Sequence, residues 1–310
     1  MSTATPEVSI ILVSYNTSSY IRRALESLFR ETHLTTFEVI VVDNASSDGS
    51  VAMIRQFFPQ VTLIESGANI GFAGGVQLGA QQATGNYLLL LNPDTVILND
   101  AVDHLLHFAR LYPANGIWSG VTLNNDMSLN TQHAWHKPNL SDLFYSATGL
   151  SKLFNKSCFF NHANYGCWER DSIKEVDIVS GCFFLTTREL WDTLGGLDAT
   201  FFMYAEEADY CLRAKALGYQ PIVSPDARIV HHGGVSHSHF SGKQIKLLKG
   251  KVELVNRHIT DWQRPLYKGL LYLYVFNKYA LHSLLKPRSE QCREWQVVFA
   301  QRHDWLQGYR

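Results

Sequence analysis

The chain lacks the features that mark secreted and membrane-spanning proteins. It has five cysteines, an odd number, and no CxxC pair, which argues against a framework of disulfide bonds. Met1–Glu7 leads into an apolar segment without the pattern of a signal peptide. No run reaches the roughly 18 uninterrupted apolar residues of a spanning helix, and no internal repeat or low-complexity tract is visible. We therefore expect a globular protein of the reducing cytosol.

Charge is moderate in amount and unevenly spread. The 310 residues are 46% hydrophobic and 18% charged, an ordinary mixture for a chain that buries a full core. The formal net charge of −1 combines 14 Lys or Arg against 23 Asp or Glu in residues 1–242 with 13 against 5 in residues 243–310. An acidic body thus carries a basic tail, which predicts an anionic partner, either nucleic acid or an anionic membrane surface.

Strand and helix patterns alternate along the first hundred residues. Continuous apolar runs predict buried parallel strands at 8–14, 38–42, 61–65 and 87–91. Helical spacing lies between them, at 18–30, 49–58 and 71–83. This alternation through short links predicts an α/β fold with a mostly parallel, doubly wound central sheet flanked by helices.

The rest of the chain is less uniform. Residues 112–175 are rich in Asn, His and aromatic residues, and we expect loops and short helices there. Strand patterns return at 177–187 and 219–230, and helical patterns at 188–194 and 206–217. After Gly242 the sequence becomes Lys-rich and helical. The predicted boundary lies near 240, between a body (1–240) and a basic, aromatic-rich helical tail (241–310).

Polar side chains follow three predicted strands directly. They are Ser14-Tyr15-Asn16, Asp43-Asn44 and Asn92-Pro93-Asp94. Open α/β sheets bind ligands beyond the carboxyl ends of their strands, so we expect these groups to share one site. Asp94 is well placed there to hold a divalent cation such as Mg²⁺ or Mn²⁺. The alternative is a cap for a helix at 99–111, a position that Asn99 or Asp100 fits better.

Two further segments have both a binding and a local structural interpretation. Asp43 either accepts hydrogen bonds from a base or ribose or closes an Asx turn, and both alternatives stay open. The segment 69–75 places glycines at a strand-to-helix junction, where backbone N–H groups can receive phosphate. Its spacing matches neither the dinucleotide-binding motif nor a P-loop.

The densest group of charged residues opens the predicted helix at 206–217. Glu206, Glu207 and Asp209 precede Arg213, which follows Asp209 by four residues. This pattern favours the helix dipole and one ion pair. The alternative is that one glutamate faces the site as a general base, desolvated by neighbouring aromatic residues. His231 follows the last predicted strand and is either a metal ligand or an ordinary polar residue.

Cys158, His162 and Cys167 resemble part of a zinc site. Structural zinc normally needs four ligands. The sequence offers no clear second pair, although His133 and His136 lie upstream. Zinc is therefore the weaker interpretation of these residues.

Eight short motifs between residues 8 and 237 together resemble the inverting family 2 glycosyltransferases of the GT-A fold. They are most similar to the bacterial rhamnosyltransferase-like branch, which builds surface polysaccharides such as O-antigen and cell-wall glycans. The motifs are 13–16 (VSYN), 41–49 (VVDNASSDG), 69–75 (NIGFAGG), 91–94 (LNPD), 179–182 (VSGC), 195–198 (GGLD), 201–213 and 231–236. The resemblance implies a GT-A catalytic domain over 1–240, with a nucleotide-sugar-binding half (1–115) and an acceptor and catalytic half (116–240).

The resemblance also implies roles for single residues. Asp43 with Tyr15, and beside them Ser14 and Asn16, would hold the base and ribose of a nucleotide sugar. The rest of the donor pocket would be lined by Asn69, Gly71, Phe72, Gly74 and Asn92.

The cation and the base follow from the same resemblance. Asp94 retains the last carboxylate of the family's Asp-x-Asp motif and would be the main protein ligand of Mg²⁺ or Mn²⁺ on the diphosphate. His231 would be a second ligand or a diphosphate contact. Glu207 stands where the branch usually has the aspartate of a Glu-Asp pair and would be the general base, with Glu206 and Asp209 as alternatives.

The implied reaction is a single displacement that inverts the anomeric carbon. dTDP-rhamnose is the first expectation for the donor, with UDP-linked hexoses or galactofuranose as alternatives. The acceptor would be a glycan or a polyprenyl-diphosphate-linked glycan. The rival interpretations are an inactive sugar-nucleotide-binding or scaffold subunit and a nucleotidyltransferase. A nucleotidyltransferase would need a Gly-rich basic signature that residues 14–19 lack.

The tail mixes aromatic residues, leucines and lysines over 262–279, and Lys286 and Arg288 follow. This composition predicts an interfacial helix on the anionic inner face of the cytoplasmic membrane, and so a cytoplasmic, peripheral protein. Packing on the body and a homodimer contact are the alternatives. Nucleic acid is not expected, because no recognition motif accompanies the charge.

Overall fold

The computed structural model describes residues 5–233 and 240–309, which form two compact units. The described part of the first unit comprises residues 5–134, 170–202 and 206–233. The second unit comprises residues 135–169, 203–205 and, within its last stretch, 240–309. The helical tail therefore shares its unit with two segments that lie well upstream in the sequence.

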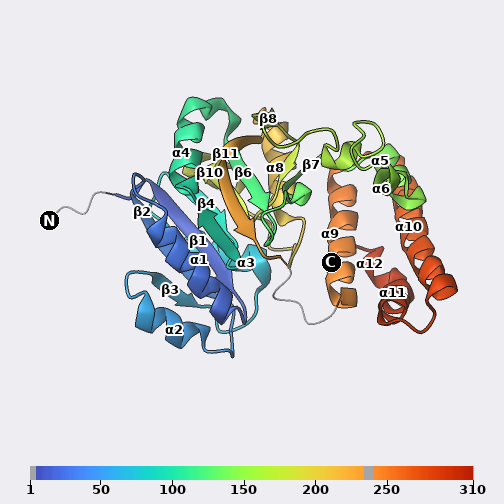
Figure 1. The fold of residues 1–310 in the computed structure, drawn as a ribbon, viewed down its shortest axis with the longest axis horizontal. Helices are drawn as coiled ribbons and strands as arrows, with labels where there is room; N and C mark the ends of the chain where they lie inside the picture. The colour runs from blue at the N-terminus through green and yellow to red at the C-terminus, as the bar shows by residue number, and fades with distance from the viewer. Residues whose placement is uncertain (1–4, 234–239, 310) are drawn as a thin grey trace. The chain divides into compact units, whose positions relative to one another are not determined.

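A mixed sheet forms the centre of the first unit (Figure 1). Among the described residues it has nine strands, in the order β3-β2-β1-β4-β10-β6-β11-β5, with β8 beside β11. The strands are β1 (Val8–Ser14), β2 (Phe37–Asp43), β3 (Thr62–Glu65), β4 (Tyr87–Leu91), β5 (Thr95–Leu98), β6 (Ile117–Leu123), β8 (Lys174–Glu175), β10 (Phe183–Thr187) and β11 (Ile222–His231).

Strand direction changes once the sheet passes β4. β3, β2, β1 and β4 are parallel. β10 runs antiparallel to both β4 and β6, β11 runs parallel to β6, and β5 and β8 run antiparallel to β11. The α/β prediction of a largely parallel central sheet flanked by helices is confirmed.

Helices cover both faces of this sheet. On one face, Leu25 of α1 (Ser18–Arg30) and Leu105 of α4 (Ala101–Leu111) join Leu12 of β1 in a single buried apolar cluster. On the other face lie α3 (Gly71–Ala80) and α8 (Glu206–Ala216), where the Tyr210 hydroxyl lies 3.1 Å from the Thr186 hydroxyl. The remaining elements are α2 (Ser50–Phe57), α7 (Arg188–Leu194), β7 (Ala134–Trp135), β9 (Ile178–Val179), η1 (Pro113–Asn115) and η2 (Thr131–His133).

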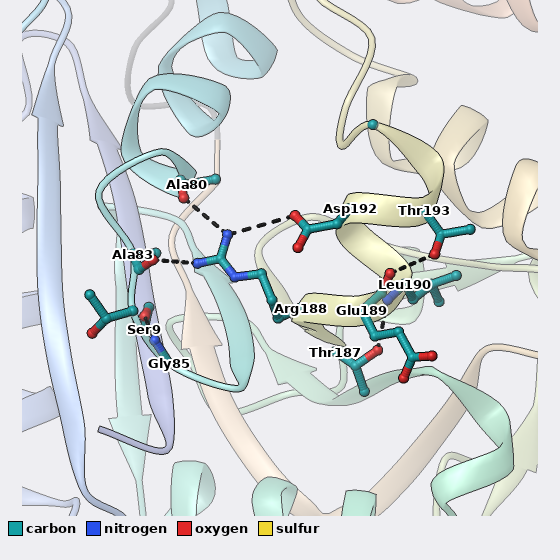
Figure 2. A network of polar contacts seen from close by, with 12 residues as sticks. Ser9, Ala80, Ala83, Gly85, Thr187, Arg188, Glu189, Leu190, Asp192 and Thr193 are labelled. Atoms are coloured by element: carbon teal, nitrogen blue, oxygen red, sulfur yellow. Dashed lines mark hydrogen bonds and ion pairs between the residues drawn. The ribbon is translucent and has the colours of Figure 1, made fainter. Parts of the chain in front are cut away.

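Arg188 fixes the rim of the sheet at which β1 and β4 begin (Figure 2). Its guanidinium donates to the carbonyl oxygens of Ala80 and Ala83, at 3.1 and 2.5 Å, and lies 3.9 Å from the Asp192 carboxylate. These bonds attach the end of α3 to the start of α7. The polar groups predicted to bind a ligand lie at the opposite rim.

Most elements of the first hundred residues match their predicted bounds. Beyond them, the segment 112–175 contains the expected loops and short helices, but it also contains the strand β6, which was not predicted. A Cβ on Gly120 would lie 2.1 Å from the Ala227 carbonyl oxygen, beside a register shift in β11. A glycine within a strand marks such a close backbone approach and weakens the strand pattern. β5, directly after Asp94, was also missed.

The second unit is helical, as predicted for the tail. Its elements are α5 (Leu140–Thr148), α6 (Leu150–Leu153), η3 (His162–Asn164), α9 (Phe240–His258), α10 (Gln263–Leu285), α11 (Glu290–Ala300) and α12 (Arg302–Trp305). Leu143 of α5 joins Val252, Leu271 and Trp305 in one buried cluster. The tail therefore has a core of its own, completed by an upstream helix.

Cys158 and Cys167, both in the second unit, form a disulfide bond. The odd number of cysteines, which argued against a disulfide framework, did not predict this pair, and the bond leaves neither sulfur available for zinc. The pair is local, nine residues apart, so it closes a single loop and is no secreted-type framework. Along the described residues, none of the helices combines the length and apolar character needed to cross a membrane.

Candidate active site

Sheet topology brings the predicted polar residues to one rim. Ser14 and Asp43 lie opposite each other at the ends of β1 and β2. Because β10 runs antiparallel to β4, its first residue, Phe183, lies opposite Leu91, the last residue of β4. β11 is directed like β4 and ends at His231, which lies opposite Thr95 at the start of β5. Asp94 and His231, distant in sequence, therefore become neighbours.

Asp94 forms an ion pair with His231. The His231 Nε2 lies 3.3 Å from the Asp94 Oδ1, and the Asn92 amide nitrogen lies 3.2 Å from the same imidazole nitrogen. The backbone N–H of His232 donates to the Asp94 carbonyl oxygen at 3.0 Å. Asp94 is only 7% exposed, so its carboxylate is held in a largely desolvated position that the ion pair compensates.

The charge state of this pair follows from its surroundings. Burial would raise the pKa of Asp94, but the hydrogen bond and charge of His231 outweigh it and hold this pKa below its usual value. Burial would lower the pKa of His231, but the Cys182 thiol and Asp94 outweigh it and raise this pKa to about 10. At neutral pH the pair is a carboxylate beside an imidazolium.

The residues at this rim fit a cation that a substrate helps to hold. Within residues 5–233 and 240–309 there is no group of three or more His, Cys, Asp or Glu that would form a metal cage. Mg²⁺ in nucleotide sites is commonly held by one or two carboxylates plus substrate phosphates, and Asp94 supplies one carboxylate. His231 would ligate only after losing its proton, because a metal ligand must be deprotonated.

Asp43 closes the predicted Asx turn with one carboxylate oxygen and keeps the other available. Its Oδ2 accepts the backbone N–H of Ser46 at 2.9 Å, which closes the Asx turn. Its Oδ1 is buried and has no hydrogen-bond partner among the described residues. A buried acceptor without a donor is costly, so this oxygen is suited to a ligand N–H or O–H group.

The loop after β1 is tied to the loop after β2. Asn16, whose φ is +52°, accepts the Ser47 N–H at 2.8 Å and donates its own N–H to the Ser46 hydroxyl at 2.9 Å. The Ser14 hydroxyl is buried 2.9 Å from the Thr17 hydroxyl. Ser14 and Asn16 therefore shape the loops, whereas Tyr15 is 36% exposed.

The glycine-rich segment is fixed to its neighbours through its backbone. Gly71 donates its N–H to the Asn69 side chain at 3.1 Å, and its carbonyl oxygen accepts the Asn44 amide at 2.8 Å. Phe72 donates its N–H to the Phe202 carbonyl oxygen at 2.9 Å. A Cβ on Gly71 would lie 2.1 Å from that same oxygen. These first two N–H groups of α3 are therefore already bonded within the protein and are not offered to a phosphate.

The three acidic residues of α8 have different surroundings. Asp209, 1% exposed, pairs with Arg213 at 2.7 Å, and Arg213 also donates to the carbonyl oxygens of Leu194 and Gly196, both at 2.8 Å. Burial, and then the charge of Glu207, raises the pKa of Glu206 well above its ordinary value. Asp209 is thus engaged in an ion pair, and Glu206 is favoured in its neutral form.

Glu207 is the most accessible of the three and lies beside the donor segment. It is partly buried. A Cβ on Gly181 would lie 3.6 Å from the Glu207 Cβ and 3.5 Å from the Phe72 ring. Gly181 thus adjoins both a carboxylate of α8 and the start of α3.

Sequence reasoning missed two contributors to the site. Cys182 lies beside His231 and accepts the backbone N–H of Asn92 at 3.1 Å through its carbonyl oxygen. Phe202 contributes a carbonyl oxygen rather than a side chain. Cys182 stands within the VSGC motif, which was a usable signal. A contact through a backbone carbonyl oxygen, such as that of Phe202, does not depend on the type of residue and so cannot be predicted from the sequence.

The fold and this rim define a glycosyltransferase of the GT-A type. The chain belongs to glycosyl transferase family 2, whose family model matches residues 9–208. The resemblance drawn from the eight motifs is thereby confirmed.

Curated relatives are similar over most of the chain. N-acetylglucosaminyl-diphospho-decaprenol L-rhamnosyltransferase of Mycobacterium tuberculosis is 25% identical over 292 residues, covering 84% of this chain and 88% of that protein. Rhamnosyltransferase WbbL of Escherichia coli K12 is 27% identical over 248 residues, covering 77% and 88% respectively.

A solved structure shares the fold. The mannosyltransferase PcManGT from Pyrobaculum calidifontis, in complex with GDP-Man and Mn²⁺, has a TM-score of 0.62 at 18% identity, covering 98% of this chain and 88% of that chain.

Proposed function

We propose that this chain transfers a sugar, with L-rhamnose as the first candidate, from a nucleoside-diphosphate donor to a glycan or polyprenyl-diphosphate-linked acceptor of surface polysaccharide synthesis. The observation that carries the proposal is the buried Asp94–His231 pair, 3.3 Å apart, at the rim that also holds the unsatisfied oxygen of Asp43. The names of the two relatives, one of which includes a diphospho-decaprenol, support rhamnose and a lipid-linked acceptor.

The residues divide the work of one displacement. Glu207 accepts the proton of the acceptor hydroxyl as its oxygen bonds to the anomeric carbon. The bond from that carbon to the diphosphate breaks, and its electron pair leaves with the diphosphate. Asp94 would hold Mg²⁺ or Mn²⁺ there, and a bound divalent cation neutralises charge on a departing diphosphate. The His231 imidazolium adds positive charge at the same rim.

The donor nucleotide would be read at the ends of β1 and β2. Asp43 Oδ1 is buried without a donor among the described residues, and thymine and uracil both present an N–H of the kind it needs. This chemistry accommodates a dTDP-sugar and a UDP-sugar alike. Tyr15, in the adjoining loop, is accessible enough to contact a base.

The membrane partner is supported by α10. Its exposed side chains include large apolar residues that are 41–81% accessible, namely Leu266, Leu273, Phe276, Leu281 and Leu284. The helix has 23 residues, about 35 Å in length at 1.5 Å per residue. Lys286 and Arg288 follow directly. An apolar helix surface beside basic residues suits the anionic inner face of a cytoplasmic membrane.

Release of nucleoside diphosphate from a panel of sugar nucleotides tests the proposal. Wild type should release it with an acceptor and Mn²⁺ or Mg²⁺, and not in EDTA, whereas Asp94→Asn and Glu207→Gln should fail. Asp126→Asn, at an exposed loop position, is the matched control. Donor binding without turnover in wild type would favour the scaffold alternative, and release of sugar 1-phosphate in place of nucleoside diphosphate would favour a nucleotidyltransferase.

A further inference from the structure

The three residues directly before Glu206 belong to a different unit from their neighbours. Met203, Tyr204 and Ala205 are part of the second, helical unit, whereas Phe202 and Glu206 on either side are part of the first. The chain thus enters the helical unit for three residues and returns at the first residue of α8. The backbone conformation of these three residues therefore leads directly into the first turn of α8, which carries Glu207.

The last residues of the described chain hold this segment. The Tyr309 hydroxyl donates to the Met203 carbonyl oxygen at 2.6 Å and lies 3.3 Å from the Lys246 carbonyl oxygen of α9. A hydroxyl has one proton, and the shorter contact is the one to Met203. Tyr309 therefore donates to Met203 while its hydroxyl lies against the backbone of α9.

Gly250 of α9 makes the second contact. A Cβ at this position would lie 2.6 Å from the Tyr204 carbonyl oxygen and 3.0 Å from the Ala205 Cβ. Both distances are shorter than side chains tolerate without movement. α9 and the segment 203–205 are therefore packed backbone to backbone, an approach that glycine alone permits.

Tyr309 is itself firmly placed. Trp305 is fully buried, and its indole N–H donates to the Val298 carbonyl oxygen at 2.9 Å. The Lys249 ammonium lies 2.8 Å from the Asp304 carboxylate. Gly308 has a φ of +84°, and a Cβ added there would lie 2.6 Å from the Glu253 Oε2 of α9. These contacts fasten residues 304–308 to α9 and α11.

The held segment has an uncommon backbone. Tyr204 and Ala205 have φ values of +74° and +77°, a region that residues other than glycine seldom occupy. Such conformations persist where the surrounding structure holds them, and they cluster at functional sites. On the other side of the segment, Phe202 is bonded to Phe72 at 2.9 Å.

We propose that Tyr309 and Gly250 are positioning residues for Glu207. By holding Met203–Ala205 in this conformation they set the first turn of α8, and with it the direction of the Glu207 carboxylate toward the acceptor hydroxyl. The inference rests on the proposed role of Glu207 as general base. Neither residue touches the substrate; both act through the backbone that precedes α8.

Tyr309→Phe is the direct test, because it removes one hydroxyl and keeps the ring. We expect kcat to fall about 10-fold, since small misplacements of a catalytic group are costly, while the KM for the donor stays unchanged. The pH–rate profile should shift on the limb that reports the base. Tyr112→Phe, the same change in a partly exposed tyrosine of the first unit, should match wild type.

Glu207→Gln separates this inference from the proposed function. If Glu207→Gln keeps the wild-type rate, the base assignment fails and the inference fails with it. If Glu207→Gln is impaired but Tyr309→Phe is not, the inference alone is overturned. Adding Tyr309→Phe to Glu207→Gln should produce no further loss, whereas independent, multiplied losses would contradict positioning through Glu207.

A contribution of Tyr309 and Gly250 to stability alone would give a different result from a positioning role. Gly250→Ala, which places a methyl group against the Tyr204 carbonyl oxygen, should reduce kcat and shift the pH profile as Tyr309→Phe does. Thermal unfolding of each variant provides the comparison. A lower midpoint with an unchanged pH profile and unchanged kcat per folded molecule, in both variants, would overturn the proposal.

Discussion

The two units differ in how many carboxyl groups they bury and in where they gather exposed apolar side chains. Among the described residues, the sheet unit has five carboxyl groups that are at most 9% exposed, and the helical unit has two. Those of the sheet unit are Asp43, Asp94, Asp103, Glu206 and Asp209, and those of the helical unit are Asp142 and Glu253. The helical unit leaves large apolar side chains of α10 in solvent, among them Leu273, Phe276 and Leu284. Buried carboxylates need compensating partners, whereas exposed apolar patches mark interaction surfaces. The contrast favours a charged small ligand for one unit and an amphipathic surface for the other.

Glu207→Gln should have the largest effect and distinguishes chemistry from folding within the sheet unit. Positioned general bases contribute about 10²- to 10⁴-fold, and kcat should fall by that factor. Donor affinity, measured by calorimetry, should stay within about twofold because the base acts on the acceptor. Loss of donor binding together with kcat would instead place Glu207 in the donor pocket.

Asp209→Ala should affect folding. Removing one partner of a buried ion pair costs about 3–5 kcal/mol, and Arg213, 27% exposed at its side chain, would retain its two carbonyl contacts. We expect a loss of about 3 kcal/mol in the free energy of unfolding by urea. Asp126→Ala, at an exposed position, is the control and should leave the unfolding midpoint close to that of wild type. Stability equal to wild type would show that the ion pair contributes nothing.

Membrane binding by the apolar surface of α10 can be tested by introducing negative charge into it. Leu273→Glu with Phe276→Glu should weaken co-sedimentation with anionic phospholipid vesicles about 10-fold or more, because burying each apolar side chain is worth about 1.5–3 kcal/mol. Turnover with a water-soluble acceptor should be unchanged. Leu34→Glu, an 86% exposed leucine of the sheet unit, is the control, and an equal effect of that change would remove α10 as the membrane surface.

Glu206→Gln should have the smallest effect, visible only through pH. Burial raises the pKa of Glu206 in the folded chain, so the wild type is progressively destabilised as pH rises above the ordinary value of 4.5. The variant, which stays neutral, should therefore be more stable than wild type at pH 8. The difference should vanish near pH 4.5. A constant difference across this range would exclude titration of Glu206 as its cause.

Sequence patterns predicted the sheet unit better than the helical one, for a physical reason. A parallel strand buried on both faces is apolar throughout, so β1 and β4 can be predicted from their own residues. The same holds for α1, whose helical spacing lies between two such strands. β6 was not predicted because Gly120 interrupts its strand pattern. The glycine is required by a close approach to the backbone of Ala227, which is distant in the sequence.

The helical unit depends on relations between distant segments. The packing of α5 with α10 is not encoded in either segment alone, and the disulfide of Cys158 with Cys167 requires geometry that spacing does not supply. At the candidate site, polar residues after apolar strands were informative. The Arg213 contact of Asp209 was also predictable, since the two are four residues apart on one helix.

Binding of dTDP and UDP, measured by calorimetry with Mn²⁺ and with EDTA, tests the central claim most directly. The account predicts that Mn²⁺ tightens the binding of at least one nucleotide to wild type, and that Asp94→Asn abolishes this gain. Equal affinity in Mn²⁺ and EDTA for wild type, or a gain that survives in Asp94→Asn, would contradict a cation held by Asp94.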